Sequence, residues 1–329
     1  MSTNILILSA GTRNKVVQAF KKELGTSGKV IATDCSNIGP AIYEADKAII
    51  VDRIDAPNYI EEILTICKQE NICGVLSLID PELSLLAKNR DKFEKIGVTP
   101  IVSSYDLCEM SLDKYKMYQA LNDYGFPTAK CYISIDSFYA ALESGEVRFP
   151  VFVKPQGGSA SININAVRSK KMLEALLNEY NNLMIQEYMH GQEYGADVYI
   201  DMISGKCTSI FLKKKIKMRA GETDKSVSVK NKVIFEKIIR FVEKMGYRGM
   251  IDIDLFHDEE NDIWYLSEVN PRFGGGYPHA YACGVNFPKQ IINNLNGIEN
   301  MVTIGEYEAG IYMMKYNELL VMSEEKLCR

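Results

Sequence analysis

The fold is decided by two runs near the C-terminal end of the chain, GMIDIDL at residues 249–255 and IWYLSEVNPR at residues 263–272. Both runs alternate apolar and polar residues as strands do, and the polar stretch between them predicts a hairpin. Side chains two apart on a strand share a face, so Glu268 and Asn270 point the same way. We expect Asp254 on the first strand to lie opposite them.

These three side chains are oxygen donors of the kind that a hard cation prefers. Two carboxylates and an amide oxygen suit Mg²⁺, which takes few protein oxygens and completes its shell with water and phosphate. The alternative is a hairpin whose charges face solvent. It does not explain a single glutamate in the otherwise apolar run from Trp264 to Val269, which leads into Arg272 and three glycines. The sequence therefore predicts a magnesium site at Asp254, Glu268 and Asn270.

A second fragment offers a cation and a flexible loop. Residues 149–155 read as a buried strand that delivers Lys154, and glycines and serines follow at 157–161. A lysine fixed at a strand end beside such a loop can place its charge on phosphate oxygens while backbone N–H groups cover them. The alternative is a surface lysine before an ordinary turn, and this fragment alone does not exclude it.

The first hundred residues alternate short apolar runs with helical patterns, which is typical of a parallel α/β sheet. The first strand ends in SAGTR at residues 9–13, where ligands of such sheets tend to bind. This turn is not GxGxxG, so a dinucleotide site is disfavoured, and we expect an ordinary strand-to-helix turn that at most borders a substrate pocket. A helix is predicted from Ser111 to Tyr124 with Ser111 as its cap, and a cap is also expected at Asp80 before a proline. Asp80 and Glu82 would alternatively suit an ammonium group.

From Lys130 onward short β-branched strands and hairpin-like turns predominate, broken by helical patterns at 170–178 and 232–245. This α+β pattern differs from the N-terminal one, so a domain boundary is expected near residue 110. The apolar stretch at residues 310–314 predicts a late strand.

Composition narrows the class of protein. Hydrophobic residues make up 47% of the 329 residues and charged residues 25%, as in soluble globular proteins. The 38 basic and 43 acidic side chains give a net charge of -5, which disfavours nucleic acid and anionic membrane as partners. No apolar run approaches the roughly 20 residues of a membrane span, and no export signal is evident, so a cytoplasmic protein is expected. The eight cysteines form no CxxC pair and are expected to be reduced thiols.

Residues 183–201, two strand-like runs joined by a polar linker, complete a series of five separated motifs. The other four are Asp113-Lys114, the Val-Lys-Pro around Lys154, the glycine and serine loop at 157–161, and the carboxylates that lead into Asn270-Pro271-Arg272. In this order they resemble the ATP-grasp superfamily, and more narrowly the carboxylate-amine ligases related to the carbamoyl-phosphate synthase large subunit and the pyrrolysine-pathway ligase.

The resemblance implies a domain plan. A Rossmann-like, pre-ATP-grasp α/β domain would occupy residues 1–110. An ATP-grasp domain of two α+β subdomains would follow over residues 111–300, with a central lid subdomain at about 130–185. A tail over residues 301–329 would pack on the grasp domain.

The resemblance also implies roles for individual residues. Two lysines would bind phosphates, the glycine and serine loop would close over the triphosphate, and the strand at 187–189 would line the adenine while Glu193 holds the ribose. The implied ATP-binding set is Lys114, Lys154, Gly157, Gly158, Ser159, Ser161, Glu187, Tyr188, Met189 and Glu193. Asp254, Glu268 and Asn270 match the metal ligands, for two Mg²⁺ ions that Mn²⁺ can replace. Arg272 matches the arginine that faces the phosphoryl group, and Arg219 lies in a basic stretch near the reaction centre.

The implied activity is that of an ADP-forming ligase, which phosphorylates a carboxylate and couples the acyl phosphate to an amine. Two alternatives remain open: carboxyphosphate chemistry with bicarbonate, and an ATP-binding subunit without turnover. Small-molecule substrates are expected between residues 11–13, residues 80–82 and the turn at 272–279, and a homodimer is left open. The lysines at 213–215 fit two alternatives, side chains that face the active site and a charged run that faces solvent.

Overall fold

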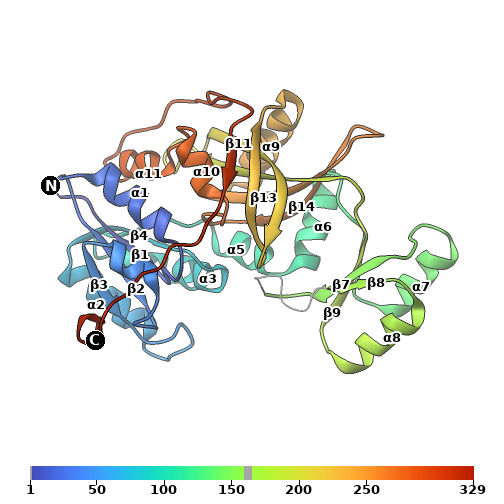
Figure 1. Cartoon of the computed structure of the whole chain (residues 1–329), viewed down its shortest axis with the longest axis horizontal. Coiled ribbons are helices and arrows are strands. Elements are labelled where there is room, and N and C mark those ends of the chain that lie inside the picture. Colours follow the sequence, from blue (N-terminus) through green and yellow to red (C-terminus); the bar gives the residue numbers. More distant parts are fainter. Residues whose placement is uncertain (1, 159–164) are drawn as a thin grey trace.

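The computed structural model describes residues 2–158 and 165–329, which build three sheets with their helices (Figure 1). The first is a five-stranded parallel sheet in the order β3-β2-β1-β4-β5. Its strands are β1 (Asn4–Leu8), β2 (Val30–Asp34), β3 (Lys47–Ile50), β4 (Ile72–Ser77) and β5 (Thr99–Pro100). Its helices are α1 (Asn14–Leu24), the 3-10 helix η1 (Pro40–Glu44), α2 (Tyr59–Gln69), α3 (Asp80–Lys88), α4 (Arg90–Glu94) and α5 (Tyr105–Leu112).

Strand β1 shows why this sheet is parallel and covered on both faces. Its residues Ile5 to Leu8 are all fully buried although successive side chains point to opposite faces. Ile5 and Ile7 pack into a core cluster that continues into the C-terminal sheet, while Leu6 and Leu8 pack into a separate cluster with α2 and α3. The α/β prediction for this region is confirmed, and the shared core fixes the parallel sheet against the rest of the chain.

The helix expected from Ser111 to Tyr124 is in fact two, so this prediction is wrong in its start and its cap. Helix α5 ends at Leu112, and α6 (Lys114–Tyr124) begins after Asp113, whose extended backbone interrupts the helical path. The Asp113 carboxylate accepts the backbone N–H groups of Tyr115 and Lys116, as an N-cap does. Ser111 instead belongs to the last turn of α5.

A small antiparallel sheet forms a separate lobe, at the right of Figure 1. Its order is β6-β9-β7-β8, and helices α7 and α8 pack on it around a core of its own. The elements are β6 (Cys131–Tyr132), α7 (Ile135–Glu143), β7 (Val151–Pro155), β8 (Asn165–Val167), α8 (Lys170–Glu179) and β9 (Leu183–Glu187).

The third sheet is antiparallel and six-stranded, in the order β14-β13-β10-β11-β12-β15. Its strands are β10 (Gln192–Ile200), β11 (Cys207–Arg219), β12 (Glu222–Val229), β13 (Gly249–Asp258), β14 (Ile263–Asn270) and β15 (Tyr312–Met314). Its helices are α9 (Lys232–Met245), α10 (Tyr277–Ala282) and α11 (Phe287–Leu295), and the tail ends with the 3-10 helix η2 (Glu324–Lys326). The late strand expected from the apolar stretch at 310–314 is therefore present as β15.

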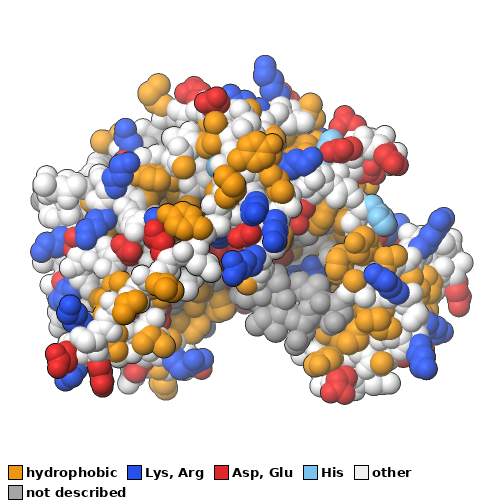
Figure 2. Space-filling view, in the orientation of Figure 1, with side chains coloured by type: hydrophobic (Ala, Val, Ile, Leu, Met, Phe, Trp, Pro, Cys, Tyr) orange, Lys and Arg blue, Asp and Glu red, His pale blue; other side chains and the backbone are white. Residues whose placement is uncertain are grey.

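The tail leads back to the N-terminal domain, where the Cys328 N–H donates to the hydroxyl of Tyr43 at 3.1 Å. No helix in the described ranges combines the length and the apolar character that a bilayer crossing requires. On the face drawn in Figure 2, basic and acidic side chains are interspersed over most of the surface, as a nearly balanced set of charges predicts.

Candidate active site

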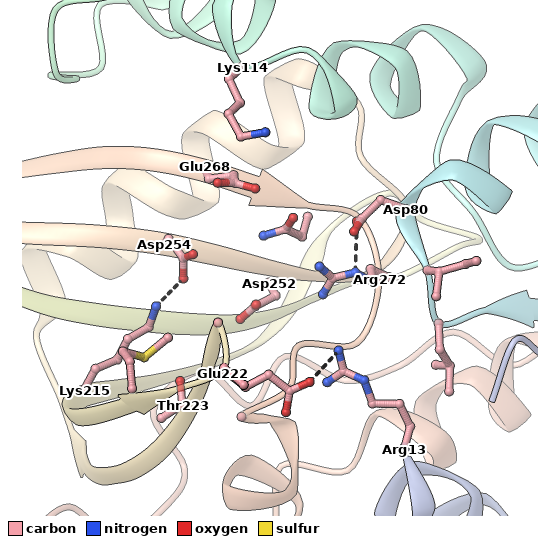
Figure 3. Close-up of a pocket in the computed structure, with 18 of the residues that line it drawn as sticks. Arg13, Asp80, Lys114, Lys215, Glu222, Thr223, Asp252, Asp254, Glu268 and Arg272 are labelled. Atoms are coloured by element: carbon pink, nitrogen blue, oxygen red, sulfur yellow. Dashed lines mark hydrogen bonds and ion pairs between the residues drawn. The ribbon is translucent and has the colours of Figure 1, made fainter. Parts of the chain in front are cut away.

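A cavity of about 230 Å³ lies where the N-terminal domain, α6, β7 and the six-stranded sheet meet (Figure 3). Its wall carries cations and carboxylates in equal number, which suits a charged ligand held at several points. The charged lining residues are Arg13, Asp80, Lys114, Lys154, Lys215, Glu222, Asp252, Asp254, Glu268 and Arg272. Asn270, Thr223, Gly275 and Gly276 line it as well.

The hairpin of β13 and β14 presents the predicted metal ligands through a β-bulge. Asp254 lies opposite Glu268 in register, and Leu255 lies opposite Leu266, so Ser267 is the extra residue. A bulge of one residue reverses the alternation of the strand. Leu266 therefore faces the core, whereas Glu268 and Asn270 face the cavity. Leu266 and Glu268 are two residues apart and would share a face on a regular strand, but the bulge between them turns them to opposite faces.

Lys114 and Lys154 come together because the start of α6 bonds to the segment after β7. The N–H of Lys114 donates to the carbonyl of Gln156 at 2.9 Å, and its Nζ donates to the carbonyl of Gly158. Burial lowers the pKa of Lys114, and the nearby Glu268 carboxylate opposes this effect. Two ammonium groups on one wall can neutralise phosphate oxygens as compact point charges.

Lys215 is a site residue that could not be assigned from sequence. Its Nζ donates to Asp254 at 2.6 Å and to Glu193 at 2.7 Å. Burial alone would lower the pKa of Lys215, but these two carboxylates outweigh it and raise the pKa, so the side chain stays charged. Lys214, on the opposite face of β11, is half-buried, and its Nζ lies 4.0 Å from Glu259 Oε1.

Lys213, two residues before Lys215 on β11, is also buried. It pairs with Asp197 on the neighbouring strand β10, and its Nζ lies 4.0 Å from Asp252. Gly195 makes room for both lysines, since a Cβ there would lie 3.1 Å from Lys213 Cε and 3.2 Å from Lys215 Cε. Burial raises the pKa of Asp197.

Arg272 is held in place by Asp80 from the N-terminal domain, with Nε to Oδ1 at 2.9 Å. Burial would lower the pKa of Arg272, but Asp80 and Asp252 outweigh it and raise the pKa. The expected cap role of Asp80 is wrong, because Asp80 is the first residue of α3 and Ile79 occupies the N-cap position. Glu82 is fully buried and accepts from the hydroxyls of Tyr59 and Ser77, so it is not available to a ligand.

The three glycines after Arg272 let charged groups approach the backbone closely. A Cβ at Gly274 would lie 2.4 Å from Asp252 Cγ, and one at Gly275 would lie 2.6 Å from Glu222 Cδ and 2.7 Å from Arg13 Nη1. Real Cβ atoms do not come this near to other heavy atoms, so each glycine makes space for a cavity side chain.

Replacement of Gly274 by alanine is accordingly expected to displace the Asp252 carboxyl while the fold survives, because that carboxyl ends a side chain that can rotate. Misplacement by about 1 Å can cost 10²-fold in rate, so kcat should fall by about 10- to 100-fold. Steady-state kinetics alongside a melting curve checks this. Unchanged kcat in a folded variant would show that the position of Asp252 is immaterial to turnover.

The structure leaves other predicted residues outside the cavity wall. Arg219 is exposed near the end of β11, although its neighbours Met218 and Ala220 line the cavity. Gly157 does not line it either, and Gly158 approaches it only through the carbonyl that Lys114 contacts. Ser159 and Ser161 lie outside the described residues.

The predicted adenine residues lie at the end of β9, on the small sheet that also carries Lys154. Glu187 Oε2 accepts the N–H of Lys130 at 3.1 Å, and the Tyr188 ring stacks on Phe152 with centroids 4.8 Å apart. These residues and Met189 do not line the cavity itself. Glu193 accepts a hydrogen bond from Lys215, which does line the cavity.

The residues present fit a magnesium ion. Asp254 and Glu268 face each other across the hairpin, and Asn270 adds an amide oxygen on the same face. Burial raises the pKa of Glu268, and the like charge of Asp254 raises it further. Two carboxylates that repel each other at a cavity wall form an arrangement that a divalent cation stabilises.

Comparisons with known proteins agree with this layout. The chain is 25% identical over 330 residues to the carbamoyl phosphate synthase large chain of Clostridium acetobutylicum, an alignment that covers 93% of this chain but 29% of that protein. It is 22% identical over 249 residues to the D-alanine–D-alanine ligase of Pseudomonas entomophila, covering 72% of this chain and 78% of the ligase. The chain thus spans less than a third of the synthase large chain.

A solved structure shares the fold. The biotin carboxylase domain of Hydrogenobacter thermophilus 2-oxoglutarate carboxylase, in complex with magnesium ADP and bicarbonate, has a TM-score of 0.73 at 17% identity, covering 95% of this chain and 74% of that chain. A model of the PylC-like N-terminal domain matches residues 5–101. A model of the ATP-grasp domain matches residues 111–276, about half of the chain. The resemblance read from the motifs is confirmed, and the chain belongs to the ATP-grasp family.

Proposed function

We propose that the chain is an ADP-forming ligase that transfers the γ-phosphoryl group of ATP to a carboxylate and couples the acyl phosphate to an amine. One observation carries this proposal: a single cavity brings two lysines, the oxygen donors of the β13–β14 hairpin and Arg272 together. Phosphoryl transfer depends mainly on positioning and on neutralising charge, and this wall supplies both. In this proposal residues 1–110 close one side of the cavity, residues 111–300 bind the nucleotide, and residues 301–329 pack on the grasp domain.

The lysines and the oxygen donors of the wall have separate roles in the proposal. Lys114 and Lys154 bind phosphate oxygens, and Glu268 and Asn270 with Asp254 hold two Mg²⁺ ions, which Mn²⁺ can replace. Bound magnesium supplies charge neutralisation on the phosphates.

At the nucleotide end, Glu187, Tyr188 and Met189 contact the adenine and Glu193 the ribose. Lys215, which bonds both Glu193 and Asp254, links the ribose end of the site to the metal end.

Arg272 stabilises the transferred phosphoryl group in this scheme. Asp80 contacts its Nε, which leaves the two terminal nitrogens to face the cavity, although Nη1 also donates to the carbonyl of Phe273 at 3.1 Å. Because Asp80 belongs to the N-terminal domain, the two domains must be assembled for this arginine to be oriented. Arg219, exposed and outside the wall, has no role that the geometry supports.

Carboxyphosphate chemistry with bicarbonate is the second candidate. It is favoured by the similarity to carbamoyl phosphate synthase and by the fold shared with a biotin carboxylase domain that was solved in complex with bicarbonate. It would use the same lysines, metal ligands and Arg272, and only the carboxylate that is phosphorylated would differ.

The nucleotide products test the proposed reaction. The lysines and the metal ligands converge on one cavity, as γ-phosphoryl transfer requires, so ADP and inorganic phosphate are the expected products in equal amounts. Chromatography of the nucleotides after incubation with candidate acids and amines measures this. Release of AMP and pyrophosphate would contradict the proposal, and ATP binding without any product would support a subunit that lacks turnover.

A further inference from the structure

The cavity has a second end that the phosphate and metal residues do not use. Figure 3 shows Arg13 and Glu222 on the side away from Lys114, with Asp252 between them and Glu268. Arg13 comes from the turn after β1 of the N-terminal domain, whereas Glu222 begins β12. This end therefore forms only where the two domains meet.

Arg13 has a donor that the protein does not satisfy. Its Nη2 pairs with Glu222 Oε1 at 3.0 Å, and the other oxygen of Glu222 accepts from Lys315 Nζ at 2.8 Å. Nη1 of Arg13 is buried and has no hydrogen-bond partner among the described residues. A buried guanidinium donor without an acceptor is unfavourable, and a ligand carboxylate would supply the missing acceptor in a matching planar geometry.

Asp252 offers the opposite charge at the same end. The nearest cation paired with it is Lys213 at 4.0 Å, and that lysine is already bonded to Asp197. The carboxyl of Asp252 packs against Gly274, and the guanidinium of Arg13 packs against Gly275. Since consecutive Cα atoms are about 3.8 Å apart, the unpaired donor of Arg13 and the carboxyl of Asp252 border the same short piece of backbone.

We propose that this end of the cavity binds the amine substrate as an amino acid, with its free carboxylate on Arg13 and its ammonium nitrogen beside Asp252. The inference rests on the proposed ligase function and names the class of one of its substrates. Ammonia would leave the Arg13 donor unsatisfied, and so would a simple amine.

The placement orients the substrate for reaction. With the carboxylate on Arg13, the nitrogen faces the metal end, where the acyl phosphate forms. A C–N bond then forms at the acyl carbon, the bond from that carbon to the phosphate oxygen breaks, and phosphate leaves with the electron pair. Of the two protons that the ammonium nitrogen loses, one stays on the released phosphate and the other goes to water. The product is an amide that keeps a free carboxylate.

Equilibrium binding tests the inference without knowledge of the acid partner. The whole chain, saturated with Mg²⁺ and a non-hydrolysable ATP analogue, is titrated with the proteinogenic amino acids, each beside its decarboxylated amine. At least one amino acid should bind at least ~10-fold more tightly than its amine, since a hydrogen bond to a charged group is worth about that factor. Arg13→Gln should remove this preference and leave the affinity for the nucleotide unchanged.

Two further variants guard against a purely structural effect. Arg13→Lys keeps the charge but not the planar fork, and should retain part of the preference. Arg53→Gln removes an arginine of the same domain that is 75% exposed, and should retain all of it. Equal binding of amine and amino acid, no amino acid binding at all, or an intact preference in Arg13→Gln would overturn the inference. Failure of the wild type to bind the nucleotide would instead contradict the proposed function.

Discussion

Alanine in place of Lys154 is expected to lower kcat by about 10²- to 10³-fold, the usual effect of losing one preorganised charge that faces developing negative charge. Lys154 is 8% exposed at the end of β7 and lines the cavity beside Lys114. Its loss leaves Lys114 alone to neutralise the phosphates from this wall. The affinity for ATP should fall with kcat, because the same ammonium binds the ground state.

The variant must be separated from a loss of folding, since the stem of Lys154 is buried. Lys154→Met keeps most of the packing and should lose activity to the same extent with a melting temperature near that of the wild type. Lys171→Ala, an exposed lysine of α8 in the same lobe, is the matched control and should be fully active. If Lys154→Met folds and keeps wild-type kcat, the lysine is structural and the phosphate role is wrong.

Glutamine in place of Glu268 is expected to raise the Mg²⁺ concentration for half-maximal rate by about 10- to 100-fold. Loss of a residue that only supports a metal ligand already weakens metal binding by about this factor, so loss of a ligand should have at least this effect. The substitution keeps the shape of the side chain and removes one of two facing carboxylates. Because Asp254 is shared with Lys215, its charge is already partly neutralised, so Glu268 should carry most of the attraction for the cation.

Magnesium titrations at saturating ATP measure this, with Glu259→Gln as the control. Glu259 lies in the turn of the same hairpin with its side chain 63% exposed, so its removal should leave the magnesium dependence unchanged. A Glu268→Gln enzyme that needs no more magnesium than the wild type would exclude this carboxylate from the metal site.

The sequence predicted the hairpin at 249–272 and placed the side chains of Asp254, Glu268 and Asn270 on one face of it, because alternation within strands is a local property. It could not show the bulge at Ser267, which depends on how the two strands pair. The change of pattern along the chain also predicted an α/β region followed by an α+β region, because that change is a local property too.

Contacts between segments that are distant in the sequence could not be predicted from local sequence patterns. Alternation shows that Lys213 and Lys215 share a face, but only the pairing of β11 with β10 shows that this face is buried and bears Glu193 and Asp197. The role of Asp80 was missed for the same reason, because its partner Arg272 lies in the other domain. A proline after an acidic residue is also the pattern of a helix start, so the local signal favoured a cap.

The central claim is that a carboxylate is phosphorylated before the amine attacks, and the fate of its oxygen tests this most directly. With the acid substrate labelled by oxygen-18 in its carboxylate, one labelled oxygen should leave in the inorganic phosphate for each amide formed, which mass spectrometry of the phosphate can count. Appearance of the label in AMP, or unlabelled phosphate alongside amide formation, would contradict an acyl phosphate and remove the role proposed for Arg272 beside the transferred group.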